Sequence, residues 1–155
     1  MGQQQLLLLV LSTVIVGLAT VAGIQAFSEN QEQATQDALV QRAINIGNDV
    51  LAAHNEPSQF GGIDLNDDPG EAKVAQAAGY GSSATGIPAD GAGDNGQCAI
   101  TKTGGSGGAT VRCNTEPGGD GSNQASSSNN WQSATVTVDG NTGNVSTSFI
   151  NSNSL

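Results

Sequence analysis

The chain has very few basic residues. Its 155 residues include four lysines and arginines against 14 aspartates and glutamates, which gives a formal net charge of −10 at pH 7. Such a surface repels the phosphate backbone of nucleic acids and the anionic headgroups of a membrane. We therefore predict no nucleic-acid partner and no docking on anionic lipid through a basic patch.

Residues that perform catalysis or bind cofactors are also scarce. His54 is the only histidine, and no spacing of Ser, His, Asp or Cys defines a nucleophilic site. The acidic run at residues 64–71 begins like a calcium loop, but Pro69 stands where that loop needs glycine, so a solvated acidic loop is favoured. We predict no enzymatic activity, no catalytic or metal site, and no cofactor.

Aromatic residues are rare, with one Trp, one Tyr and three Phe, whereas glycine occurs 22 times. A soluble domain of this composition buries only a modest core and needs further stabilisation. Cys98 and Cys113 lack the partners of a metal site, so a disulfide is favoured over the alternative of two reduced thiols. A disulfide would place this part of the chain in an oxidising compartment outside the cytoplasm.

Residues 6–24 form the one long hydrophobic run, without charge or proline. As a helix, this run measures roughly 28 Å, close to the ~30 Å hydrocarbon core of a bilayer. We predict that residues 1–27 are a hydrophobic stem, or transmembrane helix, and that residues 28–155 are a soluble head. Within the stem, small residues recur four apart, at Thr13 with Gly17 and at Ala19 with Gly23, a spacing that lets helix backbones approach closely.

The head begins with an amphipathic pattern. Residues 28–56 are predicted as a helix whose apolar positions recur at spacings of three and four, and Pro57 ends it. Residues 57–97 form a glycine-rich connecting region with a short helix at about residues 70–78. The segment 114–130, rich in Gly, Ser and Asn, is expected to be a flexible surface excursion.

Residues 98–150 are predicted as an antiparallel sheet of two hairpins, because apolar and polar residues alternate on either side of glycine-rich turns. The first hairpin brings Cys98 and Cys113 together. The fold class is therefore α+β, with a long N-terminal helix packed on a four-stranded antiparallel sheet. The expected head core is Leu39, Ala43, Ile46, Val50, Val136, Val138 and Ile150. Asn144-Val145-Ser146 matches the short and common sequon for N-glycosylation.

This layout resembles the type IV pilin family, which includes pseudopilins and archaeal pilins. The stem follows Gly2-Gln3 almost at once and runs into an amphipathic helix, and a sheet with a cysteine pair closes the chain. The resemblance implies a pilin-like fold, peptidase cleavage between Gly2 and Gln3, and N-methylation of the first mature residue.

The resemblance also implies a function as the structural subunit of an extracellular filament. Copies of the chain would wait in the inner membrane with the head outside, and the assembly machinery would then pack their stems into a helical filament on the cell surface. The residues expected to pack in the filament core are Leu6, Leu9, Thr13, Gly17, Ala19 and Gly23. Gly17 and Gly23 would allow close packing or local melting of the helix.

Two alternatives stay open. Leu7 stands where the family usually has a glutamate, which slightly favours a pseudopilin or minor pilin of a secretion or DNA-uptake system. The other alternative is a single-pass membrane protein whose head binds a ligand or an envelope component.

Overall fold

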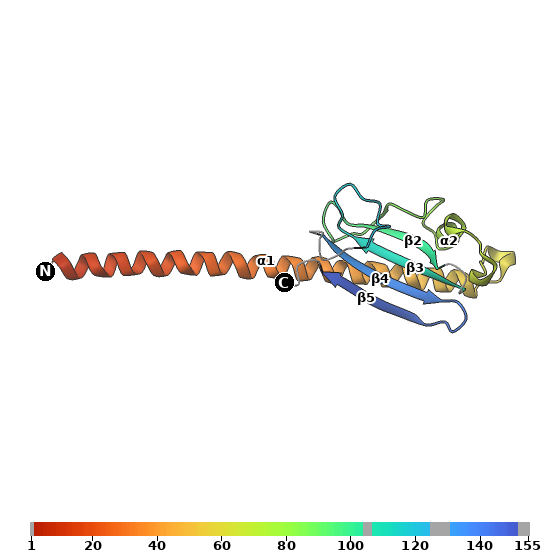
Figure 1. Cartoon of the computed structure of the whole chain (residues 1–155), viewed down its shortest axis with the longest axis horizontal. Helices are drawn as coiled ribbons and strands as arrows, with labels where there is room; N and C mark the ends of the chain where they lie inside the picture. Colours follow the sequence, from red (N-terminus) through yellow and green to blue (C-terminus); the bar gives the residue numbers. More distant parts are fainter. Residues whose placement is uncertain (1, 104–106, 125–130, 152–155) are drawn as a thin grey trace. The chain divides into compact units, whose positions relative to one another are not determined.

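The structure, a computed structural model, describes residues 2–103, 107–124 and 131–151 (Figure 1). It is an α+β chain, as predicted. The elements in order are α1 (Gly2–Asn55), the short 3-10 helices η1 (Ser58–Phe60) and η2 (Leu65–Asp67), α2 (Glu71–Ala77), β1 (Ile87–Pro88), β2 (Gln97–Thr103), β3 (Gly108–Asn114), β4 (Gln132–Asp139) and β5 (Val145–Asn151). The chain divides into two compact units, Met1–Ala34 and Thr35–Leu155.

The first unit is helical from Gly2 onward and contributes the N-terminal part of α1. The predicted boundary between a hydrophobic stem and a soluble head, between residues 27 and 28, stays a prediction, and the boundary between the two compact units falls between Ala34 and Thr35. The polar residues 28–34 account for the difference, because none of them is buried and the first buried side chain of α1 is that of Leu39. Helical periodicity continues through this polar segment, but packing on the sheet starts only after it.

The second unit contains a sheet of five strands in the order β1-β2-β3-β4-β5, and every neighbouring pair is antiparallel. The prediction of four strands was wrong, because β1 pairs Ile87 and Pro88 with Cys98 and Gln97 of β2. A strand of two residues shows no alternation that sequence reading could detect. Its proline is tolerated because β1 is at the edge of the sheet.

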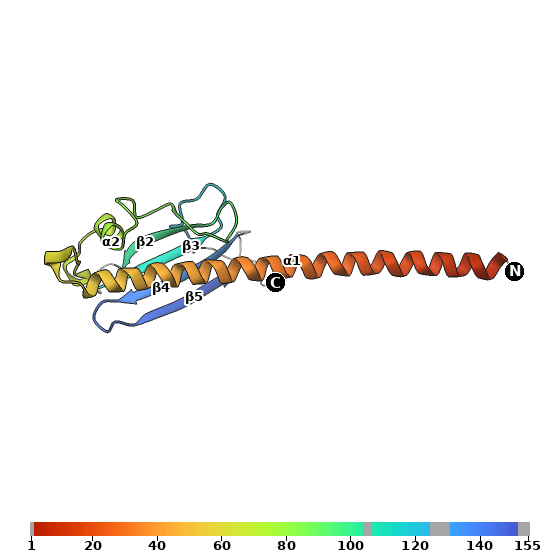
Figure 2. The ribbon, with the colours of Figure 1, turned by 180° about the vertical axis from the view of Figure 1, so that it is seen from behind.

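Within this unit, the C-terminal part of α1 covers one face of the sheet (Figure 2). The predicted core residues Leu39, Ala43, Ile46, Val50, Val136 and Val138 are all fully buried. Gly47 marks a close approach of helix and sheet, since a Cβ atom there would lie 2.9 Å from Cγ1 of Val136. The missing side chain therefore lets α1 rest directly on β4.

Ile150 is not part of this core. It pairs with Ser133 and is partly exposed, whereas its neighbour Phe149 pairs with Ala134 and packs against the core. Because successive residues of a strand point to opposite faces, a shift of one position decides which side chain faces the helix. The prediction of Ile150 as a core residue was therefore wrong by one position.

The segment after β3 makes contacts with the sheet that the sequence did not predict. Arg112 Nη1 donates to the carbonyl of Ser122, and Asn114 Nδ2 donates to the carbonyl of Asn123 at 2.8 Å. A side chain at Gly121 would overlap the backbone of Cys98, so this segment lies directly against β2. The described part of the expected surface excursion, up to residue 124, thus covers the sheet, while residues 125–130 lie outside the described residues.

Replacing Gly47 with leucine is expected to destabilise the head. The added side chain would enter a packed contact with Val136 and Val138, and such overpacking costs about 1–3 kcal/mol. Urea unfolding of a fragment that begins at residue 28 measures the effect. Ala52→Leu is the matched control, because Ala52 is exposed on the same helix; equal midpoints for the two variants would contradict the close approach.

Candidate assembly surface

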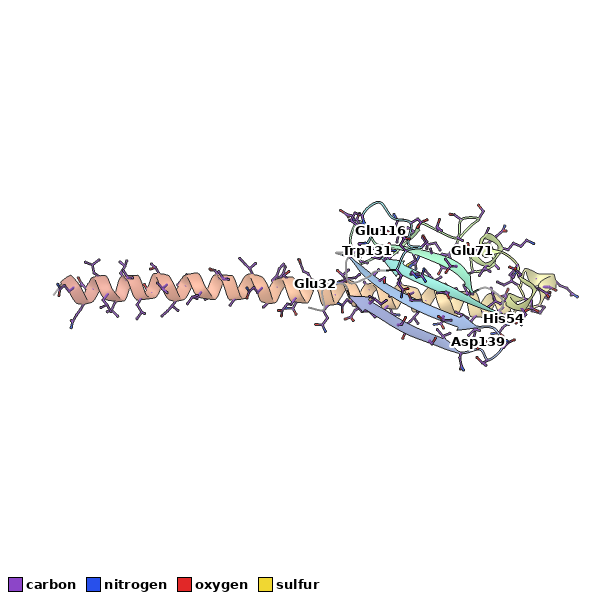
Figure 3. The ribbon with its side chains drawn as sticks, in the orientation of Figure 1. Glu32, His54, Glu71, Glu116, Trp131 and Asp139 are labelled. Carbon is purple, nitrogen blue, oxygen red and sulfur yellow. A yellow bond between two sulfur atoms is a disulfide. The ribbon has the colours of Figure 1, made fainter. Side chains whose placement is uncertain are left out.

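The first unit presents an apolar surface that no described part of the chain covers. The side chains of residues 6–24 project from the whole circumference of the helix (Figure 3). We call these side chains the assembly surface. Leu7 is 69% exposed, Leu18 68% and Ile24 71%. Residues 1–27 contain no charged side chain. A contiguous apolar surface of this size is typical of a contact with lipid or with other protein chains.

The hydroxyl groups on the assembly surface have partners within their own helix. Ser12 Oγ donates to the carbonyl of Leu9 at 2.8 Å, and Thr13 Oγ1 donates to that of Val10 at 2.9 Å. Thr20 Oγ1 donates to the carbonyl of Gly17 at 2.8 Å. Because these polar groups are already satisfied, an apolar environment can cover them without leaving a hydrogen bond unmade.

Small residues make two notches in this surface. A Cβ atom at Gly17 or Gly23 would meet nothing within 4 Å. With about 100° per residue, the pair Thr13 and Gly17 lies about 120° around the helix from the pair Ala19 and Gly23. The notches therefore face different directions, and one helix can receive more than one neighbour at close range.

The other residues predicted for packing or processing in this region are exposed, and their roles stay predictions. Leu6 is 65% exposed and Leu9 is 62% exposed. Gly2 and Gln3 are exposed in the first turn of α1. By length and composition, α1 is the one helix among the described residues that could cross a membrane. Cleavage between Gly2 and Gln3 stays a prediction.

The disulfide between Cys98 and Cys113 is present, as predicted. The two residues are directly opposite each other in β2 and β3, with their Cα atoms 3.9 Å apart, and both are fully buried. The bond therefore lies within the core that the sheet shares with α1.

His54 has a structural role. Its Nε2 lies 3.0 Å from the carbonyl oxygen of Gly140, and its Nδ1 accepts from the backbone N–H of Leu65 at 3.3 Å. The ring thus connects the end of α1 to the turn between β4 and β5, where Figure 3 also shows Asp139. In the ranges 2–103, 107–124 and 131–151, no three His, Cys, Asp or Glu side chains come together to hold a metal ion.

Sequence reading missed a cluster around Tyr80. Tyr80 Oη donates to Oδ2 of Asp49 at 2.5 Å, and the guanidinium of Arg42 lies 5.6 Å from the centre of the tyrosine ring. Arg42 Nε also donates to the carbonyl of Pro88 at 3.0 Å. Burial, followed by the hydrogen bond to Asp49, raises the pKa of Tyr80 to about 12. No pattern could have revealed these contacts, because they join residues far apart in the chain.

We expect the Tyr80 cluster to make the head less stable in strong alkali. The pKa of the folded tyrosine, about 12, exceeds the value of about 10 in an unfolded chain. Its contribution to the free energy of unfolding is therefore complete below about pH 10 and is lost as the pH rises towards 12. Tyr80 is the only tyrosine, so tyrosinate absorbance follows it directly. Tyr80→Phe is expected to remove this pH-dependent contribution to the free energy of unfolding. A tyrosinate titration of the folded head with its midpoint near pH 10, the value for an unfolded chain, would contradict the expectation.

Comparisons of the chain with protein-family models, with curated proteins and with solved structures give no match.

Proposed function

We propose that this chain is the structural subunit of an extracellular, type IV pilin-like filament, assembled through packing of its N-terminal helices. The observation that carries the proposal is the assembly surface, which is uncharged, exposed around the whole helix, and internally satisfied at Ser12, Thr13 and Thr20. Such a helix is compatible with a bilayer and with a bundle of its own copies, because neither environment leaves these hydroxyl groups without a partner.

The two notches favour a filament over a lone anchor. A helix that only anchors a head needs length and hydrophobicity, whereas close helix packing needs small residues at the contacts. Notches at Gly17 and Gly23 that face different directions fit unlike surfaces of two neighbours. Contacts between unlike surfaces produce open helical arrays when the rotation between copies does not close into a ring, while a self-complementary contact stops at a dimer.

The head fits the outside of such a filament. Its buried disulfide and its sheet protected by α1 form a core in the second unit, and its acidic surface keeps it soluble. The connecting region at residues 57–97 would then contribute to the exterior and determine what the filament contacts.

Sheared filaments provide the test of this proposal. Filaments are removed from cells that make the protein, collected by centrifugation, and their main protein is sequenced. We expect this chain to be the main component. Its absence from the filaments would contradict the proposal and favour a membrane-anchored head. Its presence in trace amounts would instead favour the minor-subunit alternative. The observation behind that alternative is the apolar Leu7, which stands where the pilin family usually has a glutamate.

The mature N-terminus is expected to begin at Gln3 and to carry a methyl group on its amine. Gly2 and Gln3 are accessible at the start of α1, as a peptidase at the membrane would require. Mass spectrometry of the N-terminal peptide from isolated protein measures both changes. An intact Met1 in the mature protein would contradict cleavage after Gly2.

A further inference from the structure

We propose that Asn144 is the attachment site of an N-linked glycan. Asn144-Val145-Ser146 is the only Asn-x-Ser/Thr sequence in the chain, and this sequence is the acceptor that N-glycosylation requires. The proposal does not depend on filament assembly. It depends on the position of the sequon in the fold and on the extracytoplasmic location that the disulfide indicates.

The sequon begins directly after an exposed turn, and its last two residues are the first residues of β5. Asn144 follows the turn between β4 and β5, and both Asn144 and Ser146 are exposed. Among the described residues, none hydrogen-bonds the side-chain amide of Asn144 or the hydroxyl of Ser146. The contrast with Asn114 is clear, since Asn114 is fully buried and its amide donates to the carbonyl of Asn123. The amide nitrogen that must react is therefore accessible at Asn144.

The backbone holds the turn in place without using this amide. Asp139 Oδ1 accepts from the N–H groups of Asn141 and Thr142 at 2.9 and 3.3 Å. The N–H of Gly143 donates to the carbonyl of Asp139 at 2.8 Å, and the N–H of Asp139 donates to the carbonyl of Asn144 at 2.9 Å. These bonds present Asn144 at a fixed corner of the head, so a bulky substituent can be carried there without disturbing the core.

The adjoining strand leaves room for a glycan. β5 is the last strand in the sheet order, so its outer edge has no partner among the described strands. Ser146 pairs with Thr137, on the face of the sheet turned away from α1. Exposed edge strands invite pairing with other chains, and a hydrated glycan at the start of β5 would shield this edge.

The chemistry is a group transfer without oxidation or reduction. The donor is an oligosaccharide linked through its anomeric carbon to a lipid phosphate, and a membrane-bound transferase brings it to the sequon. Nδ2 of Asn144 forms a bond to the anomeric carbon, and the bond from that carbon to the phosphate oxygen breaks. The lipid phosphate leaves with the electron pair, and the transferase accepts the proton from Nδ2.

Intact-mass measurement of the protein from its own cells tests the proposal. We expect a mass above that of the processed, disulfide-bonded chain by the mass of an oligosaccharide, located by fragmentation on the peptide with Asn144. Asn144→Gln and Ser146→Ala are both expected to remove the added mass completely. An unmodified wild-type chain, or a glycan that persists in Asn144→Gln, would overturn the proposal.

Matched variants separate loss of the sequon from loss of the fold. Ser146→Thr preserves the sequon and is expected to retain the glycan. Asn141→Gln changes an asparagine of the same turn that belongs to no sequon, and is also expected to retain it. Loss of the added mass in Ser146→Thr or in Asn141→Gln, with the disulfide still formed, would contradict recognition of the sequon at Asn144.

Discussion

Aspartate at Leu9 or at Gly17 is expected to abolish filament assembly while the head stays folded. In the assembled state the charge would be buried among apolar helices without a partner, and an isolated buried carboxylate costs several kcal/mol or more. At Gly17, near the middle of residues 6–24, the substitution also places a charge at the centre of a membrane helix, at a cost of about 2.5–3.5 kcal/mol on insertion scales. Both residues belong to the first unit, and neither is a member of the core of the second unit.

The measurements are the amount of sheared filament from each variant and the formation of the Cys98–Cys113 disulfide in the full-length variant, which reports the fold of its head. A fragment that begins at residue 28 lacks both substituted positions, and its stability shows whether the head folds without the stem. Leu9→Met is the control for side-chain replacement, because it conserves volume and carries no charge. Asn30→Asp is the control for charge, because residue 30 is exposed in the polar part of α1. Normal filament yield from Leu9→Asp would contradict burial of the assembly surface, and an unfolded fragment would show that the head needs the stem.

Removal of the disulfide is expected to produce the largest loss of stability in the head. The bond closes a loop with a sequence separation of 15, for which chain entropy predicts a contribution of about 3 kcal/mol. Replacement of Cys98 and Cys113 with alanine also removes two fully buried sulfur atoms from the core, and the resulting cavity adds to the loss. A small domain with few aromatic residues has little stability in reserve.

Urea unfolding of the head fragment, with and without the double substitution, measures this loss. The wild-type fragment in reducing agent is the internal control, since it loses the bond but keeps the sulfur atoms. Both forms are expected to unfold at lower urea than the oxidised fragment, and the alanine variant at the lowest. Coincident transitions for all three would contradict a stabilising role for the bond.

Local patterns were sufficient to predict most of the second unit. The apolar stripe that includes Leu39 and Val50 and the alternation in β4 both arise from residues close in sequence, and the structure buries them as expected. The hairpin of β2 and β3 likewise placed Cys98 opposite Cys113. Each of these predictions rests on a repeat that the backbone geometry imposes.

The features that were missed depend on contacts between distant segments. β1 has two residues and exists only because β2 offers it a partner. The segment up to residue 124 is held by backbone carbonyls that accept from Arg112 and Asn114, and a run of Gly, Ser and Asn gives no periodic pattern for such bonds. The hydrogen bond of Tyr80 to Asp49 spans 31 residues. The periodicity of a sequence carries no information about any of these three contacts.

The proposed packing of the assembly surface in two directions follows from helix geometry. A photoreactive amino acid at Leu9, activated by ultraviolet light in cells that make the protein, tests this most directly. In an array of unlike contacts, each copy links to the next, so a single probe produces a ladder of products with several copies. The same probe at Asp90, an exposed residue of the connecting region, serves as the comparison. We predict a ladder from Leu9 that extends beyond the dimer, whereas monomers and dimers alone would contradict filament assembly through residues 6–24.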